Sequence, residues 1–336
     1  MRIGLNPNKD GVIKPSNYIH QVIIPVFIPN KEGYFKDSLK VFKLCIESLL
    51  STIHNKTFIT IVNNGSSQVV KEYLELLFNN RKIHELINTE NIGKLNAILK
   101  GLAGNEIEIV TISDADVLFL PNWQKETIKV FCNIPKVGVV GMVPQFKMFE
   151  AHCGNVLYDN FFNRKLKFLP VKNPKALQMF YDSIGWDKNY NQDYLKYSLG
   201  LEISKDLSVL IGSGHFVATY KKDMFSEISS YLGYKLGGVS ETYLDKAPLS
   251  KGYWRLTTQD NYAYHMGNTL EDWMEVLPQQ EQFEENINSN FNINKKSNKF
   301  VYLFKNRVFV KLFSIAFLNR LFLKWKLLPK EMVNTY

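Results

Sequence analysis

Two aspartates two residues apart, Asp114 and Asp116, are the residues whose type and spacing most clearly suggest chemistry. They follow a largely apolar run, residues 107–112, and apolar residues resume after them. Two carboxylates this close repel each other and lose hydration unless a positive charge compensates them. A metal ion, a lysine or water could fill that role. Mg²⁺ or Mn²⁺ would bind both carboxylates and hold a diphosphate through its oxygens.

A second interpretation of the pair needs no metal. Either aspartate could instead cap the N-terminus of the segment that follows it. An Asp-x-Asp also occurs by chance in many proteins. The pair therefore gains meaning only from its position at the end of a strand, and the sequence leaves both interpretations open.

The elements that would position this pair alternate between strand and helix. Strands are predicted over residues 21–29, 58–62, 83–88, 107–112 and 137–143, and helices over residues 39–53, 69–78 and 93–102. This alternation predicts an α/β fold with a mostly parallel central sheet and helices on both faces. Ligands of such sheets bind beyond the carboxyl ends of the strands, where polar residues 63–65 and the aspartate pair are expected.

The pattern divides the chain into three parts. Residues 1–145 carry the alternation, and residues 146–278 first lose clear periodicity and then regain it. Residues 279–336 begin with a polar stretch, expected to be a linker or an exposed helix, and end in an apolar and basic tail that we expect to be helical.

Composition narrows the class of protein. A chain of 336 residues with 45% hydrophobic and 13% aromatic residues is expected to be globular. Cys45, Cys132 and Cys153 lie far apart without a C-x-x-C motif, so neither a zinc site nor a disulfide framework is indicated. Residues 1–20 lack the apolar stretch of a secretory signal, and we expect a cytoplasmic protein.

The net charge of +9 is concentrated in the tail. Residues 299–330 contain eight Lys or Arg and no acidic residue, which leaves +1 (9 − 8) elsewhere and argues against a nucleic-acid groove. The longest charge-free run, residues 312–319, is far shorter than the roughly 20 residues of a bilayer span. We expect short helices in peripheral contact with an anionic membrane, at the cytoplasmic face of the inner membrane. The alternative is a helical cap packed on the domain.

Several short motifs, in this order, resemble the inverting family-2 glycosyltransferases with the GT-A fold. They are IIPVFIPN, FITIVNNGSS, NTENIGKLNAILKGL, IVTISDADVLFLPNW, GSGHFVATYKKDMF, GGVSETYLDKAPLSKGYW and YAYHMGN, and they span roughly residues 20–268. The resemblance implies a hexosyltransferase that uses Mn²⁺ or Mg²⁺. It would move a sugar from a nucleotide-diphosphate donor to a hydroxyl of a glycan or lipid-linked oligosaccharide, in surface polysaccharide synthesis.

The resemblance also assigns roles to individual residues. Donor-binding residues would be Pro25, Phe27, Pro29, Asn30, Asn63, Asn91, Gly93, Lys94, Asp114, Gly212, Ser213 and Gly214. Metal ligands would be Asp114, Asp116 and His265, and the catalytic base would be Glu241, with Asp245 in reserve. Such a base deprotonates the acceptor hydroxyl as it attacks the anomeric carbon. Residues 1–145 would bind the nucleotide-sugar, and residues 146–278 would supply the base and bind the acceptor.

Some positions depart from the family pattern and keep alternatives open. Asn63 stands where the family usually has a base-reading aspartate; an asparagine oxygen still accepts from uracil N3–H, so a UDP-sugar is favoured. Ser240 and Glu241 replace the usual Glu-Asp pair. A sugar-nucleotide nucleotidyltransferase is one alternative, although residues 24–35 lack its glycine-rich basic loop. A non-catalytic module that binds nucleotide-sugars is another.

Overall fold

The computed structural model describes residues 4, 9, 11–12, 16–227, 231–233, 240–276, 291 and 296–336, with only the backbone at 227, 240 and 241. The predicted alternation is present, with each element within a few residues of its predicted bounds. It comprises β1 (His20–Val26), α1 (Ser38–Thr52), β2 (Thr57–Asn64), α2 (Gln68–Asn79), β3 (Glu85–Thr89), α3 (Lys94–Leu102), β4 (Ile109–Ser113) and β6 (Val137–Gly141). Two elements between β4 and β6 were not predicted, β5 (Val117–Phe119) and α4 (Trp123–Asn133).

The following part of the chain, where the periodicity is first lost and then regained, is also folded. It contains α5 (Gly154–Asp159), β7 (Leu166–Pro170), α6 (Pro174–Ser183), β8 (Tyr197–Ser204), β9 (Leu207–Ile211), β10 (Val217–Lys221), α7 (Ser240–Ser250), β11 (Trp254–Thr258) and β12 (Ala263–His265). The tail forms α8 (Lys299–Leu303), the π-helical η6 (Phe304–Phe309) and α9 (Ala316–Trp325). Short 3₁₀ turns are η1 (Gly33–Phe35), η2 (Met148–Glu150), η3 (Gln192–Leu195), η4 (Lys222–Glu227), η5 (Asp272–Glu275) and η7 (Leu312–Ser314). The expected linker, residues 279–298, lies largely outside the described residues.

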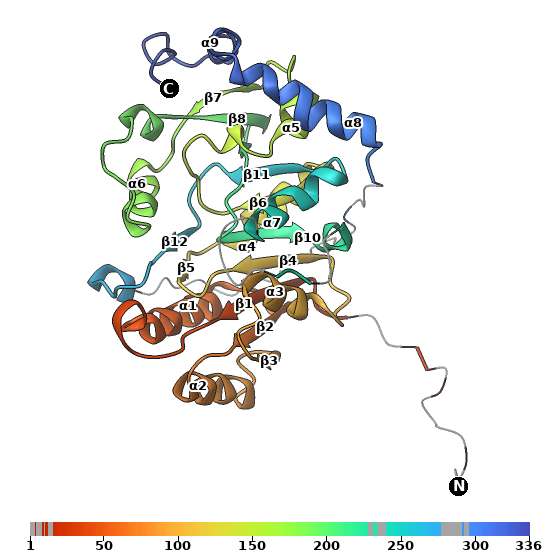
Figure 1. The fold of residues 1–336 in the computed structure, drawn as a ribbon, viewed down its shortest axis with the longest axis vertical. Helices are drawn as coiled ribbons and strands as arrows, with labels where there is room; N and C mark the ends of the chain where they lie inside the picture. The colour runs from red at the N-terminus through yellow and green to blue at the C-terminus, as the bar shows by residue number, and fades with distance from the viewer. Residues whose placement is uncertain are drawn as a thin grey trace.

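One large sheet organises the described chain (Figure 1). Its strand order is β3-β2-β1-β4-β10-β6-β11-β9-β8-β7. Seven of these strands share one direction, and β10, β9 and β7 run against them. The predicted α/β fold with a mostly parallel central sheet is confirmed. The antiparallel β10 lies between β4 and β6, and it brings the second half of the chain against the first.

Strand β1 shows why the central strands are apolar along their whole length. Val22 and Ile24 face the cluster that includes α1 and α2, whereas Ile23, between them, packs in the cluster with α3. Since neighbouring residues of a strand point to opposite faces, helices must cover both sides of the sheet. Both faces of β1 are therefore buried, and its carboxyl end is the part left for polar contacts.

The C-terminal tail packs on the domain. Phe309, Phe322 and Tyr336 are buried in one cluster with side chains of β7 to β9 and β11. The predicted helical tail is thus present, and its inner face forms the helical cap. No helix within the described ranges is long and apolar enough to cross a membrane.

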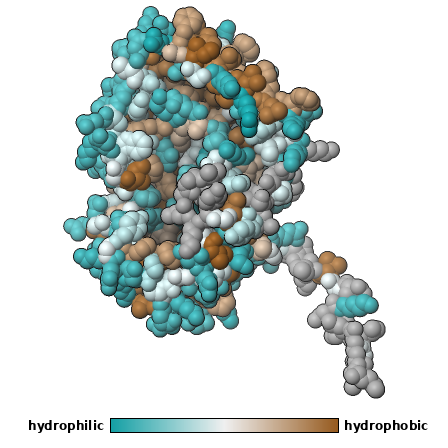
Figure 2. All heavy atoms as spheres, in the orientation of Figure 1, coloured by the Kyte–Doolittle hydropathy of each residue, from teal (hydrophilic) through white to brown (hydrophobic). Residues whose placement is uncertain are grey.

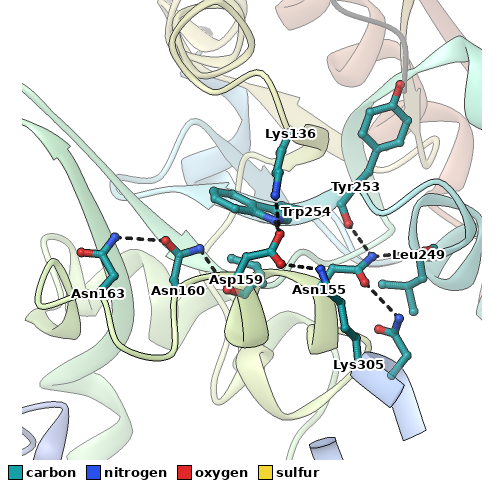
Figure 3. A network of polar contacts seen from close by, with 11 residues as sticks. Lys136, Asn155, Asp159, Asn160, Asn163, Leu249, Tyr253, Trp254 and Lys305 are labelled. Atoms are coloured by element: carbon teal, nitrogen blue, oxygen red, sulfur yellow. Dashed lines mark hydrogen bonds and ion pairs between the residues drawn. The ribbon is translucent and has the colours of Figure 1, made fainter. Parts of the chain in front are cut away.

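A partly buried carboxylate fixes the tail to the domain (Figure 3). Asp159 accepts hydrogen bonds from Lys136 Nζ at 2.8 Å and Trp254 Nε1 at 3.0 Å, and it forms an ion pair with Lys305 of η6. Burial by itself raises the pKa of Asp159. The hydrogen bonds from Lys136, Lys305 and Trp254 outweigh it and hold the pKa below its ordinary value.

Close backbone approach completes this junction. A Cβ at Gly154 would lie 2.5 Å from the carbonyl oxygen of Lys305, so only glycine lets α5 and η6 meet here. Asn306 donates a hydrogen bond to Asn155, which in turn donates to the Leu249 and Tyr253 carbonyl oxygens (Figure 3). The tail is therefore held by polar as well as apolar contacts.

We predict that Asp159→Asn lowers the free energy of unfolding by about 2 kcal/mol, because Lys305 loses its partly buried anionic partner. The folded-state pKa of Asp159 is depressed. Its stabilisation is therefore complete above the unfolded value of about 4, and it is lost as the pH falls through the folded value. Urea unfolding at pH 7 and pH 3 should show a difference between the two proteins that shrinks at pH 3. Asp206→Asn, at an exposed position, is the control; an equal loss in both variants would contradict the prediction.

Candidate active site

A cavity of about 470 Å³ opens beyond the carboxyl ends of β1, β2 and β4. It is lined by Pro25, Val26, Phe27, Ile28, Tyr34, Phe35, Ser38, Val41, Asn64, Asn91, Lys94, Asp114, Ala115, Asp116, Gly267 and Asn268. One side is apolar and aromatic, and the other carries the aspartate pair and a lysine. This is the edge of the sheet at which ligands of α/β folds bind.

Each aspartate of the pair has a different basic partner. Asp114 Oδ1 lies 2.6 Å from Lys94 Nζ, and Asp116 Oδ2 lies 3.5 Å from His265 Nε2. Lys94 is placed by Gly93, whose φ of 88° turns the chain into α3. The negative charge of Asp114 is thus compensated by Lys94, and the carboxylate of Asp116 faces His265.

A short strand pair brings His265 to this edge. β5 follows the aspartates directly and pairs antiparallel with β12, so that His265 lies opposite Val117. The amide of Met266 donates to the Asp116 carbonyl oxygen at 2.7 Å. On its other side, His265 Nδ1 lies 2.9 Å from Ser183 Oγ, which fixes the orientation of the ring.

Asp116 carries an unsatisfied oxygen. Its Oδ1 is buried and has no hydrogen-bond partner among the residues that the structure describes. Burial is the largest influence on the pKa of Asp116 and raises it; His265 opposes this, and the nearby Asp114 adds to it, so the pKa lies above its ordinary value. A buried carboxylate oxygen without a donor is costly unless a ligand supplies a positive charge or a donor.

These residues fit a divalent cation in donor chemistry. A carboxylate and an imidazole are ligands that Mn²⁺ accepts, and the unpartnered oxygen of Asp116 points to a missing partner. Within the described ranges, no three His, Cys, Asp or Glu side chains are grouped to hold a metal. Asp114, the third predicted metal ligand, contacts Lys94, and its role as a ligand stays a prediction.

The structure brings together about half of the predicted donor-binding residues. Pro25, Phe27, Asn91, Lys94 and Asp114 line the cavity, and Gly93 caps the helix beside it. Pro29 and Asn30 lie just beyond β1 and do not line it. Their proposed roles stay predictions.

Of the two asparagines at the end of β2, the one that lines the cavity is Asn64, one residue after the predicted Asn63. Asn63 is buried, donates to Asn88 Oδ1 at 2.8 Å, and accepts from the Ser66 amide at 3.0 Å. Asn64 accepts from the Ile92 amide at 2.9 Å and lines the cavity. Both residues end β2, and because neighbouring residues of a strand point to opposite faces, only one of them can face the cavity.

Other cavity residues were missed. Tyr34, Phe35 and Asn268 come from η1 and from the segment after β12. The available signals were aromatic residues soon after a strand end, and a Gly-Asn pair after the candidate histidine.

The predicted Gly212–Ser213–Gly214 segment does not line the cavity. Gly212 has a φ of 101°, and a Cβ at Gly214 would lie 2.3 Å from Gln145 Nε2. The carbonyl of Ser213 accepts from Arg255. These contacts give the segment a packing role, and its donor contact stays a prediction.

The two candidate bases lie four residues apart in α7. Glu241 is in the first turn of the helix, and its side chain lies outside the described residues. Asp245 forms an ion pair with Arg255 and lies 3.7 Å from His215 Nδ1. Burial alone would raise the pKa of Asp245, but the nearby His215 and the charge of Arg255 hold it below its ordinary value.

Comparison with known proteins agrees with this geometry. The sequence model described as glycosyl transferase family 2 matches residues 22–183, which contain β1 to α6 and both aspartates of the pair. The chain is a family-2-like glycosyltransferase with a GT-A fold. The predicted family, fold and enzyme class are thereby confirmed.

Solved structures similar to this glycosyltransferase are distant in sequence. Residues 1–349 of TarS from S. aureus, in complex with UDP-GlcNAc, are 14% identical, with a TM-score of 0.44; the match covers 77% of this chain and 61% of that one. The mannosyltransferase PcManGT from Pyrobaculum calidifontis, in complex with GDP-Man and Mn²⁺, is 15% identical, with a TM-score of 0.45, covering 94% and 75%. The match thus spans less than two thirds of the TarS chain. A comparison with curated proteins finds no match.

Proposed function

We propose that the protein is a metal-dependent, inverting glycosyltransferase. It would transfer a sugar from a nucleoside-diphosphate donor, with UDP favoured, to a hydroxyl of a glycan or lipid-linked oligosaccharide in surface polysaccharide synthesis. The observation that carries the proposal is the aspartate pair at the edge of the cavity, with Lys94 on one carboxylate and His265 facing the other.

The two sides of the cavity suit the two parts of such a donor. Phe27 and Tyr34 offer aromatic surface for the nucleoside base and ribose. An asparagine oxygen accepts from uracil N3–H, and the asparagines that line the cavity are Asn64, Asn91 and Asn268. Lys94 and the N-terminal amides of α3 favour the diphosphate.

The residues suited to the cation are Asp116 and His265. When bound, Mn²⁺ or Mg²⁺ would neutralise the charge that develops on the departing diphosphate. Asp116 would contribute its unpartnered oxygen, and Ser183 would keep the His265 ring turned toward it. We assign Asp114 to Lys94 and to the donor side of the cavity.

We assign the base to Glu241. Inversion requires a carboxylate that removes the proton of the acceptor hydroxyl as its oxygen attacks from the face opposite the diphosphate. Asp245 is a weak candidate, because its ion pair with Arg255 depresses its pKa. Its contacts instead fit a residue that positions Arg255 and His215.

The test is thermal unfolding with UDP, GDP, CMP and dTDP, each with Mn²⁺ and with EDTA. A nucleotide at 100 times its Kd adds about 2.7 kcal/mol of stability, which raises Tm by a few degrees. We expect a shift with UDP that EDTA abolishes. A shift with a different single nucleotide would reassign the base, and no shift with any of them would contradict the proposal.

A further inference from the structure

Residues 299–330 have an inner and an outer face with different chemistry. On the inner face, Phe309 and Phe322 are buried in the core, and two of the eight basic side chains are used structurally. Lys305 pairs with Asp159, and Lys326 donates to the carbonyl oxygens of Phe161 and Asn163 at 2.6 and 3.2 Å. The segment is thus held in one orientation, and the remaining side chains define its outer face.

The outer face exposes large apolar side chains. Phe300 is 81% exposed in α8, and Phe317 and Trp325 are 67% and 46% exposed in α9. Figure 2 shows apolar surface gathered at the upper end of the molecule, where Figure 1 places α8 and α9. Soluble proteins rarely expose apolar side chains in such concentration without a binding partner.

Part of this face is a groove of about 440 Å³ between η7, α9 and the loop after α5. Its open rim includes Phe162, Leu312, Leu321 and Trp325, and all of its lining residues are apolar. Phe162 is 84% exposed and lies in edge contact with Trp325. A groove without a polar group suits a hydrocarbon chain better than a peptide, whose backbone needs hydrogen bonds.

The charges of the outer face all have one sign. Six basic residues (8 − 2) are exposed there, and none forms an ion pair with a residue of the described chain. They are Lys299, Arg307, Lys311, Arg320, Lys324 and Lys330. In α9, Arg320 and Lys324 lie beside Phe317 and Leu321 on the same side of the helix, at i, i+3 and i+4 spacing. Within residues 299–330, the exposed apolar side chains are therefore accompanied by basic side chains and by no acidic one.

We propose that this outer face, residues 299–325 together with Phe162, docks on an anionic lipid bilayer and that its groove receives an acyl chain. Exposed aromatic and aliphatic side chains enter the interface, while Lys and Arg extend to lipid phosphates. Anionic headgroups match the uniform positive charge, which a second copy of this face would repel. Docking on a bilayer is separate from the proposed transfer reaction, because it requires neither the nucleotide-sugar donor nor the acceptor. A protein that does not bind vesicles could therefore still transfer sugar.

The first experiment is co-sedimentation of the full chain with two kinds of vesicle. One contains phosphatidylcholine alone, and the other contains about 30% phosphatidylglycerol as the anionic lipid. We expect binding only to the anionic vesicles. The double variant Arg320→Glu/Lys324→Glu should bind at least about 25-fold more weakly, since each basic residue that is lost near such a surface contributes roughly a factor of five and the new glutamates repel anionic lipid. The matched control is Arg81→Glu/Lys82→Glu, which makes the same charge change at the exposed end of α2, at the opposite end of the molecule in Figure 1, and should bind normally.

The second experiment detects contact directly. Brominated lipid in the same vesicles should quench the fluorescence of Trp325. The variant Trp325→Phe retains the other four tryptophans, and their fluorescence should not be quenched. Phe162→Ser/Leu321→Ser, at two exposed positions, should weaken binding without changing Tm. Equal binding of both charge variants, or quenching that persists in Trp325→Phe, would overturn the proposal. So would concentration-dependent self-association through this face without vesicle binding, which would assign the face to a second copy.

Discussion

Replacing Asp116 by asparagine is expected to lower kcat/KM for sugar transfer by about 10³-fold, within the range found when one electrostatic stabiliser of a transition state is removed. The amide keeps the size of the side chain but loses its charge. Since Oδ1 is buried without a partner and Oδ2 faces His265, this carboxylate is the group best placed to hold a cation. The nucleotide-induced rise in Tm should also become insensitive to EDTA.

The second readout separates a metal ligand from a structural aspartate. Burial raises the pKa of Asp116, so its charge is costly in the free protein, and Asp116→Asn should not lower Tm in the absence of ligands. Asp206→Asn should keep full activity, because Asp206 is exposed and does not line the cavity. If Asp116→Asn kept both transfer and the EDTA-sensitive shift, the aspartate pair would be only a turn, and the metal assignment would be wrong.

Glu241→Gln is expected to lower kcat by 10²- to 10⁴-fold, the usual contribution of a general base, and to leave nucleotide binding unchanged. The glutamine keeps the shape of the side chain but cannot take up the proton of the acceptor hydroxyl. Transfer rates and the UDP-induced thermal shift, measured on the same preparation, check both parts of the expectation.

Asp245→Asn is the informative comparison, because the same helix carries it one turn later. It would leave Arg255, only 4% exposed, without its anionic partner, so a lower Tm is expected with only a modest change in rate. A large loss of rate at unchanged Tm in Asp245→Asn would transfer the role of base to Asp245. Loss of nucleotide binding in Glu241→Gln would make Glu241 structural.

The sequence alone predicted most strands and helices between residues 20 and 143, where the pattern of apolar residues matches their burial in the folded protein. β1 and β4 are buried on both faces, so their apolar runs are continuous and easily recognised. The aspartates after β4 were also identifiable, because a charged pair contrasts with such a strand. Residues 146–206 were harder to predict: β7 has only 5 residues, and β8 runs through consecutive buried positions to half-buried and exposed ones, so neither period dominates.

The partners of the site were less predictable than its position. The contact of Lys94 with Asp114 depends on how α3 packs against β1 and β2, which no local pattern encodes. The choice between Asn63 and Asn64 depends on which face of β2 turns to the cavity. In the tail, the basic residues looked alike in sequence, and only the positions of Asp159 and of the Phe161 carbonyl separate the inward pair from the outward six.

The pairing of β5 with β12 also bears on how the protein loses activity. Asp116 and His265 are 149 positions apart (265 − 116), and they meet through a two-stranded ribbon that is separate from the large sheet. The ribbon is itself buried, because Val117, Phe119 and Ala263 lie in the same core cluster as side chains of α1 and α2. Warming or denaturant should therefore separate the histidine from the carboxylate only when this core opens, so inactivation should coincide with global unfolding. During synthesis, the same geometry delays assembly of the site until the chain has grown well past the nucleotide-binding half.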